Sequence, residues 1–401
     1  MSRKVLIAGA GVAGLEAALA LRDLAEDRLA VELLAPDAEF VYRPLSVAEP
    51  FRVGEARRFP LSRFADVIAV ELTQGSVESV DHEGRTVRTS DGADLEYDWL
   101  LLASGAKPVP SIPGAVTFRG PGDEGLLATV LEDARAGRVR RLVFALPSGA
   151  SWPLPLYELA LLSAVHLADA GARVELEVVT PELRPLELFG AAAGDAVVDL
   201  LNAHGVGLRR DAVAVAVEGG SLRLVPEGYV DADRVVTLPR LEGRRLSGIP
   251  HDANGFVPTD QNGHVLGCPD VFAAGDLTDF PVKQGGIAAQ QADAAAESIA
   301  AAAGAPIEPR PFRPVLRGLL LTGLTPRYLR AEPGRQAAEG RHGTALVAAG
   351  EDRRPVPRSI PGGAATPLRG ASTGERECPR GRDRIRARAG GDLDAAVGRF
   401  P

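Results

Sequence analysis

The start of the chain carries two kinds of hydrophobic pattern in succession. Lys4 to Ala8 form a short apolar run, and after Gly14 the apolar positions recur at helical period. From Val31 to Leu34 the pattern is again typical of a strand. This order predicts a strand, a helix and a second strand, which together form one βαβ unit.

A glycine turn joins the first predicted strand to the helix. Gly9, Gly11 and Gly14 fall at GxGxxG spacing. In such a turn the first glycine permits a tight bend, the second lets the backbone approach a pyrophosphate, and the third lets the helix pack closely on the strand. The helix N-terminus adds unpaired N–H groups and about half a positive charge. The pattern favours a dinucleotide site over a merely structural turn.

The ribose of this dinucleotide has two candidate environments. In such folds an acidic residue about 20 positions past the last glycine binds the ribose hydroxyls. Ala35 occupies that place here, and Asp37 follows it closely. Either Asp37 binds the ribose from the loop, or the ribose has no carboxylate partner.

Three further segments of the first third of the chain have recognisable patterns. Phe40 to Phe51 is expected to be a loop over the ligand crevice, because Arg43 and Pro44 stop regular structure and its aromatic residues favour contact with a flat group. The alternation from Ser76 to Thr89 predicts a hairpin. Asp98 to Pro108 predicts an apolar strand that ends in a turn of small residues.

A second βαβ pattern covers Arg140 to Thr180. A nicotinamide site would need GxGxxG after Leu146, but Pro147 to Pro153, PSGASWP, contains a single glycine. Trp152 is expected to fill the space that a pyrophosphate would occupy. We therefore do not expect NAD(P)H to bind in its usual pose.

Length and composition narrow the classes of function. The chain has 401 residues, enough for two or three domains, and its net charge of -8 argues against nucleic acid as a partner. It has no uninterrupted apolar run of about 18 residues, so we expect no transmembrane segment and a cytoplasmic protein. Two cysteines, Cys268 and Cys378, predict no disulfide framework, and no metal site is expected.

Three short segments resemble the signatures of one family. GAGVAG near the start, LLASGAKP at Leu101 to Pro108 and VFAAGD at Val271 to Asp276 are similar to the FAD-binding segments of the two-dinucleotide-binding-domain flavoprotein oxidoreductases. Within that family the chain most resembles the branch of type II NADH dehydrogenases, sulfide:quinone reductases and flavocytochrome c sulfide dehydrogenases. The order and spacing of the segments cover about residues 1 to 330.

The resemblance implies an α/β fold with two Rossmann-like, doubly wound domains, the first of which is discontinuous in sequence. The FAD-binding domain would comprise residues 1–115 and 245–310, and the second dinucleotide-binding-like domain residues 116–244. Residues 311–332 would begin a C-terminal domain, and residues 333–401 would form a separate tail.

The same resemblance implies which residues contact the cofactor. Val77 would lie near the adenine, and Asp276 would accept hydrogen bonds from the ribitol hydroxyls, although it also suits the N-cap of the following helix. The residues expected against FAD are Gly9, Ala10, Gly11, Val12, Ala13, Gly14, Asp37, Arg43, Pro44, Val77, Ala103, Ser104, Gly105, Gly275, Asp276, Lys283, Gln284, Gly285 and Gly286.

An alanine-rich helix is expected over Pro281 to Ala303, entered through Gly285 and Gly286. In the resembling enzymes such a helix points at the flavin, where its N-terminus favours the anionic reduced form. Lys283 would lie beside the ring, which makes it the candidate catalytic residue. Its alternative interpretation is a solvated lysine.

The sequence does not identify the electron donor. Pro153 to Glu158 resembles a turn of the sulfide-oxidising branch, whose members use a pair of redox cysteines. Cys268 is the one cysteine in the resembling part, and we expect it to be a small buried apolar residue. The expected function is FAD-dependent electron transfer from a small donor to a quinone-like or soluble acceptor. Two alternatives stay open: a type II NADH dehydrogenase with an altered nicotinamide site, and a non-catalytic redox sensor or inactive remnant.

The composition changes after Glu332. Pro333 to Pro401 has no tryptophan, tyrosine or lysine, which predicts a disordered tail. The alternative is a tail translated out of frame: Leu346 to Pro361 can be encoded by codons that read WWPPGKIAGRYLAPYL after a shift of one base. That peptide resembles a C-terminal segment of similar flavoproteins. The sequence leaves open the oligomeric state and peripheral contact with the inner face of a membrane.

Overall fold

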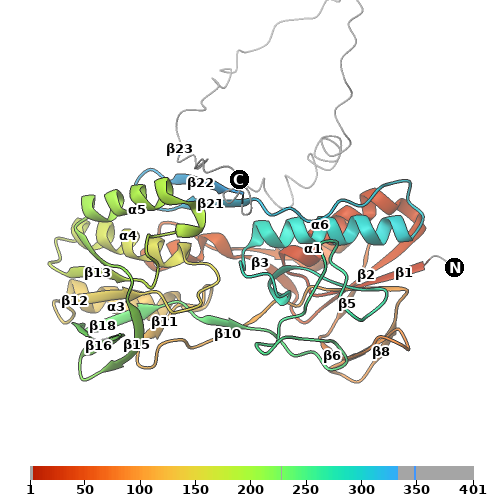
Figure 1. The fold of residues 1–401 in the computed structure, drawn as a ribbon, viewed down its shortest axis with the longest axis horizontal. Helices are drawn as coiled ribbons and strands as arrows, with labels where there is room; N and C mark the ends of the chain where they lie inside the picture. The colour runs from red at the N-terminus through yellow and green to blue at the C-terminus, as the bar shows by residue number, and fades with distance from the viewer. Residues whose placement is uncertain (1–2, 227, 333–346, 349–401) are drawn as a thin grey trace, which may run out of the picture. The chain divides into compact units, whose positions relative to one another are not determined.

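The computed structural model describes residues 3–226 and 228–332, and the backbone of residues 347–348. Two parallel five-stranded sheets dominate this part of the chain (Figure 1). Helices pack on both sheets, so the predicted α/β fold with two Rossmann-like domains is confirmed. Apart from residues 347–348, the predicted tail and its out-of-frame alternative lie outside the described residues.

The first sheet has the strand order β20-β9-β1-β2-β5, and each neighbouring pair is parallel. Its strands are β1 (Arg3–Ala8), β2 (Leu29–Ala35), β5 (Glu71–Gln74), β9 (Trp99–Leu102) and β20 (Val271–Ala273). Side chains of β1 alternate between two cores: Val5 and Ile7 face one, and Leu6 and Ala8 face the other. Both faces of this sheet are therefore buried, as expected for parallel strands.

Two helices cover one face of this sheet, α1 (Val12–Ala25) and α6 (Gly285–Ala302) (Figure 1). The core beneath them includes small side chains from both helices, among them Ala17 and Ala292, both fully buried. The other face is covered by an antiparallel meander of β6 (Val77–Asp81), β7 (Thr86–Thr89) and β8 (Asp94–Glu96). The first two strands of this meander are the hairpin predicted over Ser76 to Thr89.

The second sheet has the parallel order β11-β18-β12-β13-β14. Its strands are β11 (Val116–Thr117), β12 (Arg141–Ala145), β13 (Glu175–Val179), β14 (Val206–Arg209) and β18 (Arg234–Thr237). The helices of this part are α3 (Glu124–Arg135), α4 (Leu154–Asp169) and α5 (Ala191–Ala203), and its antiparallel meander comprises β15 (Val213–Glu218), β16 (Ser221–Val225) and β17 (Tyr229–Asp231). The second half thus repeats the plan of the first.

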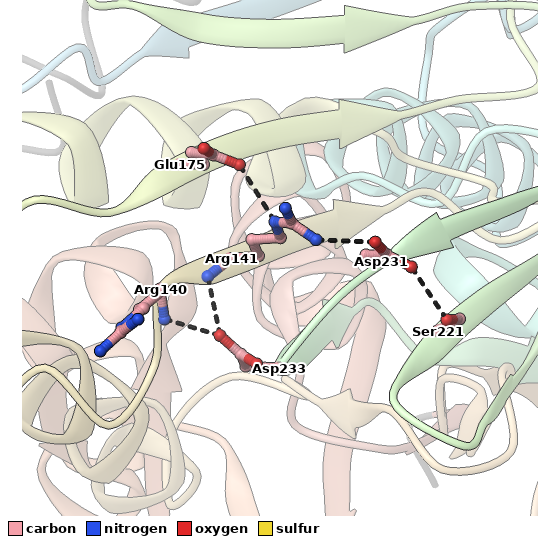
Figure 2. Close-up of polar contacts among 6 residues, drawn as sticks. All are labelled: Arg140, Arg141, Glu175, Ser221, Asp231 and Asp233. Carbon is pink, nitrogen blue, oxygen red and sulfur yellow. Dashed lines mark hydrogen bonds and ion pairs between the residues drawn. The ribbon is translucent and has the colours of Figure 1, made fainter.

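An aspartate precedes the equivalent strand in both sheets and binds the start of the central strand. Asp98, before β9, accepts a hydrogen bond from the Lys4 N–H at 2.6 Å. Asp233, before β18, accepts hydrogen bonds from the N–H groups of Arg140 and Arg141 at 2.7 and 3.0 Å. Figure 2 shows this second contact, with the Arg141 guanidinium extended toward Glu175 and Asp231. These carboxylates bind backbone N–H groups at the amino edge of each sheet. Ligands of such sheets bind at the opposite edge, where the strands have their carboxyl ends.

The remaining elements connect and cover the two sheets. An antiparallel ribbon of β10 (Lys107–Val109) and β19 (Arg240–Glu242) links them. The others are η1 (Glu26–Arg28), β3 (Glu39–Tyr42), η2 (Arg43–Phe51), β4 (Arg57–Pro60), α2 (Leu61–Ile68), η3 (Glu187–Phe189), η4 (Gly275–Leu277), β21 (Leu316–Leu320), β22 (Arg327–Ala331) and β23 (Val347–Ala348), where η denotes a 3-10 helix.

The expected loop over Phe40 to Phe51 is wrong, because the segment is a short strand followed by a 3-10 helix. Two of its aromatic residues contact other rings of the protein: Phe40 stacks on Phe59, and Phe51 meets the edge of His166. Val47 and Phe51 belong to the hydrophobic core of the second half, so this segment joins the two halves.

Candidate functional site

The glycine turn after β1 has one open position and two crowded ones. A Cβ atom at Gly14 would lie 1.8 Å from the Gly9 carbonyl oxygen, and one at Gly9 would lie 2.3 Å from the Ala103 oxygen. At Gly11 a Cβ would meet nothing within 4 Å. Gly9 and Gly14 are therefore required by the protein itself, whereas nothing within the protein requires a glycine at position 11.

Two helix N-termini meet beside this turn. A Cβ on Gly285, the first residue of α6, would lie 3.7 Å from the Val12 side chain at the start of α1. Among the described residues, no hydrogen bond uses the N–H groups of Val12, Ala13 or Gly14, or those of Gly285 or Gly286. Unpaired N–H groups at two helix starts form a strong site for anionic or electron-rich groups.

The turn after β9 lies against the glycine turn. The Ala103 N–H donates to the Ala8 oxygen at 2.8 Å, which continues the pairing of β9 with β1. Gly105 has a φ of +69°, a value that favours glycine. The Ser104 hydroxyl is buried and has no hydrogen-bond partner among the described residues. A buried, unpartnered hydroxyl beside an open backbone cradle indicates a place where a ligand supplies the partner.

The turn after β20 completes the same edge. Gly275 has a φ of +79°, and its N–H donates to the Gln291 side chain at 2.9 Å. Asp276 is partly buried, and burial raises the pKa of its carboxyl, whereas the charges of Lys283 and Arg43 lower it. The expectation that Asp276 caps the next helix is wrong, because α6 begins at Gly285 and Gln284 is its N-cap. The Gln284 side chain accepts the Ile287 N–H at 3.0 Å.

Lys283 is buried, with 8% of its surface exposed. Its ammonium donates to the Thr278 carbonyl oxygen and lies 4.0 Å from the centre of the Phe256 ring. Burial lowers its pKa to about 8, against the opposing effect of Asp276, Asp279 and Asp252. The alternative interpretation as a solvated lysine is therefore wrong. A cavity of about 250 Å³ adjoins Lys283.

The structure brings most of the predicted cofactor residues to one edge. Residues 9–14, 103–105, 275–276 and 283–286 lie at the carboxyl ends of β1, β9 and β20 or at the start of α6. The others follow β2 along the chain: Asp37, Arg43 and Pro44 are exposed, and Val77 is half-buried at the start of β6. Their contact with a cofactor stays a prediction.

Comparison with known proteins identifies the family. Residues 3–142 and 158–298 match the pyridine nucleotide-disulphide oxidoreductases. The chain belongs to this family. Its members are oxidoreductases, and this chain is a flavin-dependent oxidoreductase that transfers electrons through the flavin.

Two curated proteins and one solved structure illustrate the similarity. The chain is 30% identical over 298 residues to the NADH dehydrogenase-like protein MT1860 of Mycobacterium tuberculosis, covering 68% of this chain and 72% of that protein. It is 30% identical over 295 residues to apoptosis-inducing factor 3 of Mus musculus, covering 70% of this chain but 46% of that protein. The structure of the sulfide:quinone oxidoreductase from Aquifex aeolicus has a TM-score of 0.78 at 21% identity, with 86% and 87% of the two chains covered.

The second dinucleotide-type turn of this oxidoreductase differs from the first. Proline residues occupy positions 153 and 155 at the start of α4, and the Leu156 N–H is used by the Pro153 oxygen at 3.1 Å. The first turn of α4 therefore offers fewer free N–H groups than that of α1. Trp152 packs edge-on against Phe189, with ring centres 5.8 Å apart.

The carboxylate nearest the end of β13 is occupied by a protein partner. In nicotinamide-binding domains an acidic residue beyond the second strand binds the ribose. Here Glu182 is buried and accepts hydrogen bonds from the hydroxyls of Tyr157 and Thr180, at 2.5 and 3.1 Å. Burial raises the pKa of Glu182 and that of Tyr157.

A second buried carboxyl lies one residue along α4. Glu158 is 4% exposed and accepts the Leu321 N–H at 2.9 Å. Burial raises its pKa to about 8. Glu158 therefore keeps its proton to a higher pH than an ordinary glutamate does, and the sequence had singled it out only as the end of the turn from Pro153 to Glu158.

Several contacts at the site were not foreseen from the sequence. The Arg244 guanidinium donates to the backbone carbonyl oxygen of Ser104 at 2.8 Å, across 140 positions of the chain. The Gln291 side chain accepts a hydrogen bond from the Gly275 N–H and donates one to the Thr278 hydroxyl. Glutamine inside an otherwise alanine-rich helix was the one local signal for this role.

Cys268 is buried, as expected. Within the described ranges, every helix is too short or too polar to cross a membrane.

Proposed function

We propose that the chain binds FAD along the carboxyl edge of its first sheet. The observation that carries the proposal is the open cradle at Gly11 between two helix starts with unpaired N–H groups. The residues present fit the cofactor: residues 9–14 suit the pyrophosphate, the orphan Ser104 hydroxyl suits a polar partner, and Asp276 suits the ribitol hydroxyls. Bound FAD would accept an electron pair from a donor and pass it to an acceptor.

We propose a small molecule other than NAD(P)H as the electron donor. The start of α4 contains prolines in place of the glycines of α1, and Glu182 is held by Tyr157 and Thr180. A dinucleotide in the usual pose would find fewer donors for its pyrophosphate, and the candidate ribose acceptor is already in use. Such unpaired groups cost about 1 to 3 kcal/mol each.

The acceptor in this proposal is quinone-like or soluble, as the resembling branch suggests. We propose a cytoplasmic location, with peripheral contact at the inner face of a membrane as the alternative. Sedimentation with and without vesicles separates the two, because a peripheral protein is recovered in the vesicle pellet.

The first test is the visible spectrum of the purified protein under anaerobic conditions, before and after NADH. We expect a flavin spectrum, FAD as the released cofactor, and no bleaching by NADH. Sulfide and other small reductants are then added in turn and the spectrum is recorded after each. Dithionite is added last to show that the flavin can be reduced. A colourless protein that takes up no added FAD would overturn the proposal.

A type II NADH dehydrogenase with an altered nicotinamide site is the second candidate. The observation in its favour is the 30% identity to a relative named NADH dehydrogenase-like. Rapid bleaching by NADH, followed by reoxidation with a quinone, selects this candidate. A flavin that no donor reduces except dithionite selects a redox sensor or an inactive remnant.

A further inference from the structure

Lys283 lies where two parts of the chain face each other across a cavity. The cavity of about 250 Å³ is lined by Lys283 and Phe256 from the first half and by Gly149 and Ser151 from the loop after β12. Backbone contact continues beside it, because the Lys283 N–H donates to the Ser151 oxygen at 3.4 Å. The ammonium therefore stands at the junction of the two dinucleotide-type folds.

The Lys283 ammonium has unused hydrogen-bonding capacity. Of its three N–H donors, one is bound by the Thr278 oxygen, and no further acceptor is found among the described residues. The Phe256 ring covers it at 4.0 Å and excludes water from that side. A buried ammonium with free donors stabilises any negative charge that develops beside it.

The charged groups around Lys283 come from three segments. Asp276 lies in η4, Asp279 follows η4, and Asp252 lies in the turn before Phe256. Arg43, from the start of η2, acts on Asp276. The Asp252 carboxylate is already used by the N–H groups of Asn254 and Phe256. These carboxylates favour the ammonium, whereas burial favours the neutral amine.

We infer that Lys283 takes up a proton when the flavin is reduced, and so couples electron uptake to proton uptake. This rests on the proposed FAD site. Bound FAD would take up two electrons and one solvent proton, which would leave one negative charge beside Lys283. Where Lys283 is a neutral amine beforehand, the new negative charge draws a second solvent proton onto its nitrogen.

The coupling predicts a break in the pH dependence of the flavin potential. Below the lysine pKa of about 8, Lys283 is already charged and one proton accompanies each electron pair. Above it, a second proton is taken up. Each proton per electron pair contributes about 30 mV per pH unit, so the slope should steepen from about 30 to about 59 mV per pH unit.

The experiment is a spectroelectrochemical titration of the FAD-loaded chain between about pH 6.5 and pH 9.5, for wild type and three variants. Lys283→Gln should show the shallow slope throughout, with a lower potential. Lys283→Arg keeps a permanent charge and should show the shallow slope with a potential near that of wild type at low pH. Arg63→Gln, which removes one charge at an exposed position on α2, should reproduce the wild-type break.

The titration tests the proposed FAD site and the role of Lys283 separately. If the chain takes up no FAD, the proposed function fails and this inference fails with it. If FAD binds but wild type and Lys283→Gln share one slope, the proposed function stands and the coupling role of Lys283 is overturned. If Lys283→Gln loses FAD, Lys283→Arg decides, because retention of the break in that variant contradicts the inference.

Discussion

The hydroxyl of Tyr157 donates a hydrogen bond to the Glu182 carboxylate at 2.5 Å, inside the second half of the molecule. Tyr157 is fully buried, and Glu182 is 9% exposed. The tyrosine comes from the first turns of α4, and the glutamate follows β13. The pair therefore joins the two segments that would hold a second dinucleotide.

Tyr157→Phe should destabilise the fold by about 1 to 3 kcal/mol, because Glu182 keeps Thr180 as its one side-chain donor. The loss should grow as pH rises. The tyrosine hydroxyl lowers the pKa of Glu182, so its removal raises that pKa further and makes ionisation of the buried carboxyl costlier. Urea unfolding at acidic and alkaline pH measures this. Tyr328→Phe, at an exposed tyrosine, should change neither value.

Gly11→Ala and Gly14→Ala should separate cofactor binding from folding. A Cβ at position 11 meets no protein atom within 4 Å, so the apo-protein should keep its melting temperature and lose FAD. A Cβ at position 14 would collide with the Gly9 oxygen, so that variant should melt at a lower temperature as well. Released flavin and apo-protein melting are the two measurements. Full FAD content in Gly11→Ala would contradict the placement of the pyrophosphate.

Glu158→Gln should remove a pH dependence of stability. The pKa of Glu158 is about 8 in the folded chain, above its ordinary value of 4.5. The folded state binds the proton more tightly, so wild-type stability falls as pH rises from about 4.5 to 8, by at most about 1.4 kcal/mol per pH unit. The glutamine variant should be the more stable protein at alkaline pH. Glu78→Gln, at an exposed position on β6, serves as the control.

Asp233→Ala should weaken the second sheet through the amino end of β12. The Asp233 carboxylate binds two backbone N–H groups, and these bonds lower its pKa from the ordinary value of 3.8. Its stabilising effect is therefore present at neutral pH and is lost as pH falls through the folded-state pKa. The urea midpoints of variant and wild type should differ at pH 7 and converge in strong acid. Asp233→Asn, which keeps one oxygen acceptor, should be intermediate.

The elements that the sequence predicted are those with a continuous local pattern. The first βαβ unit, the strand of β9 and the glycine entry of α6 all follow from apolar periodicity and glycine spacing within short segments. The exact start of α6 and its N-cap did not follow, because the sequence offered Asp276 for the cap. The segment between them, LTDFPVKQ, has no period, so nothing local says that Gln284 caps the helix.

The site residues that the sequence missed are held by contacts between distant segments. Arg244, which follows β19, donates to the Ser104 carbonyl oxygen, and Tyr157 donates to Glu182 across 25 positions. In the sequence alone, Arg244 resembles an ordinary surface arginine, Tyr157 a core tyrosine and Glu182 an acidic residue in a loop. Their partners are decided by how the sheets stack, which one-dimensional patterns do not encode.

The β10–β19 ribbon sets Val109 directly opposite Arg240. Opposed residues of antiparallel strands have Cα atoms about 4.5 to 5.5 Å apart, a gap that one or two residues can bridge. After β9 the chain therefore leaves the first sheet along β10, and it returns along β19, the strand paired with β10. In genetic terms residues 110–239 form an insertion between two facing residues of the ribbon, and their core also includes Val47 and Phe51 of η2, so an exchanged segment must match η2 as well.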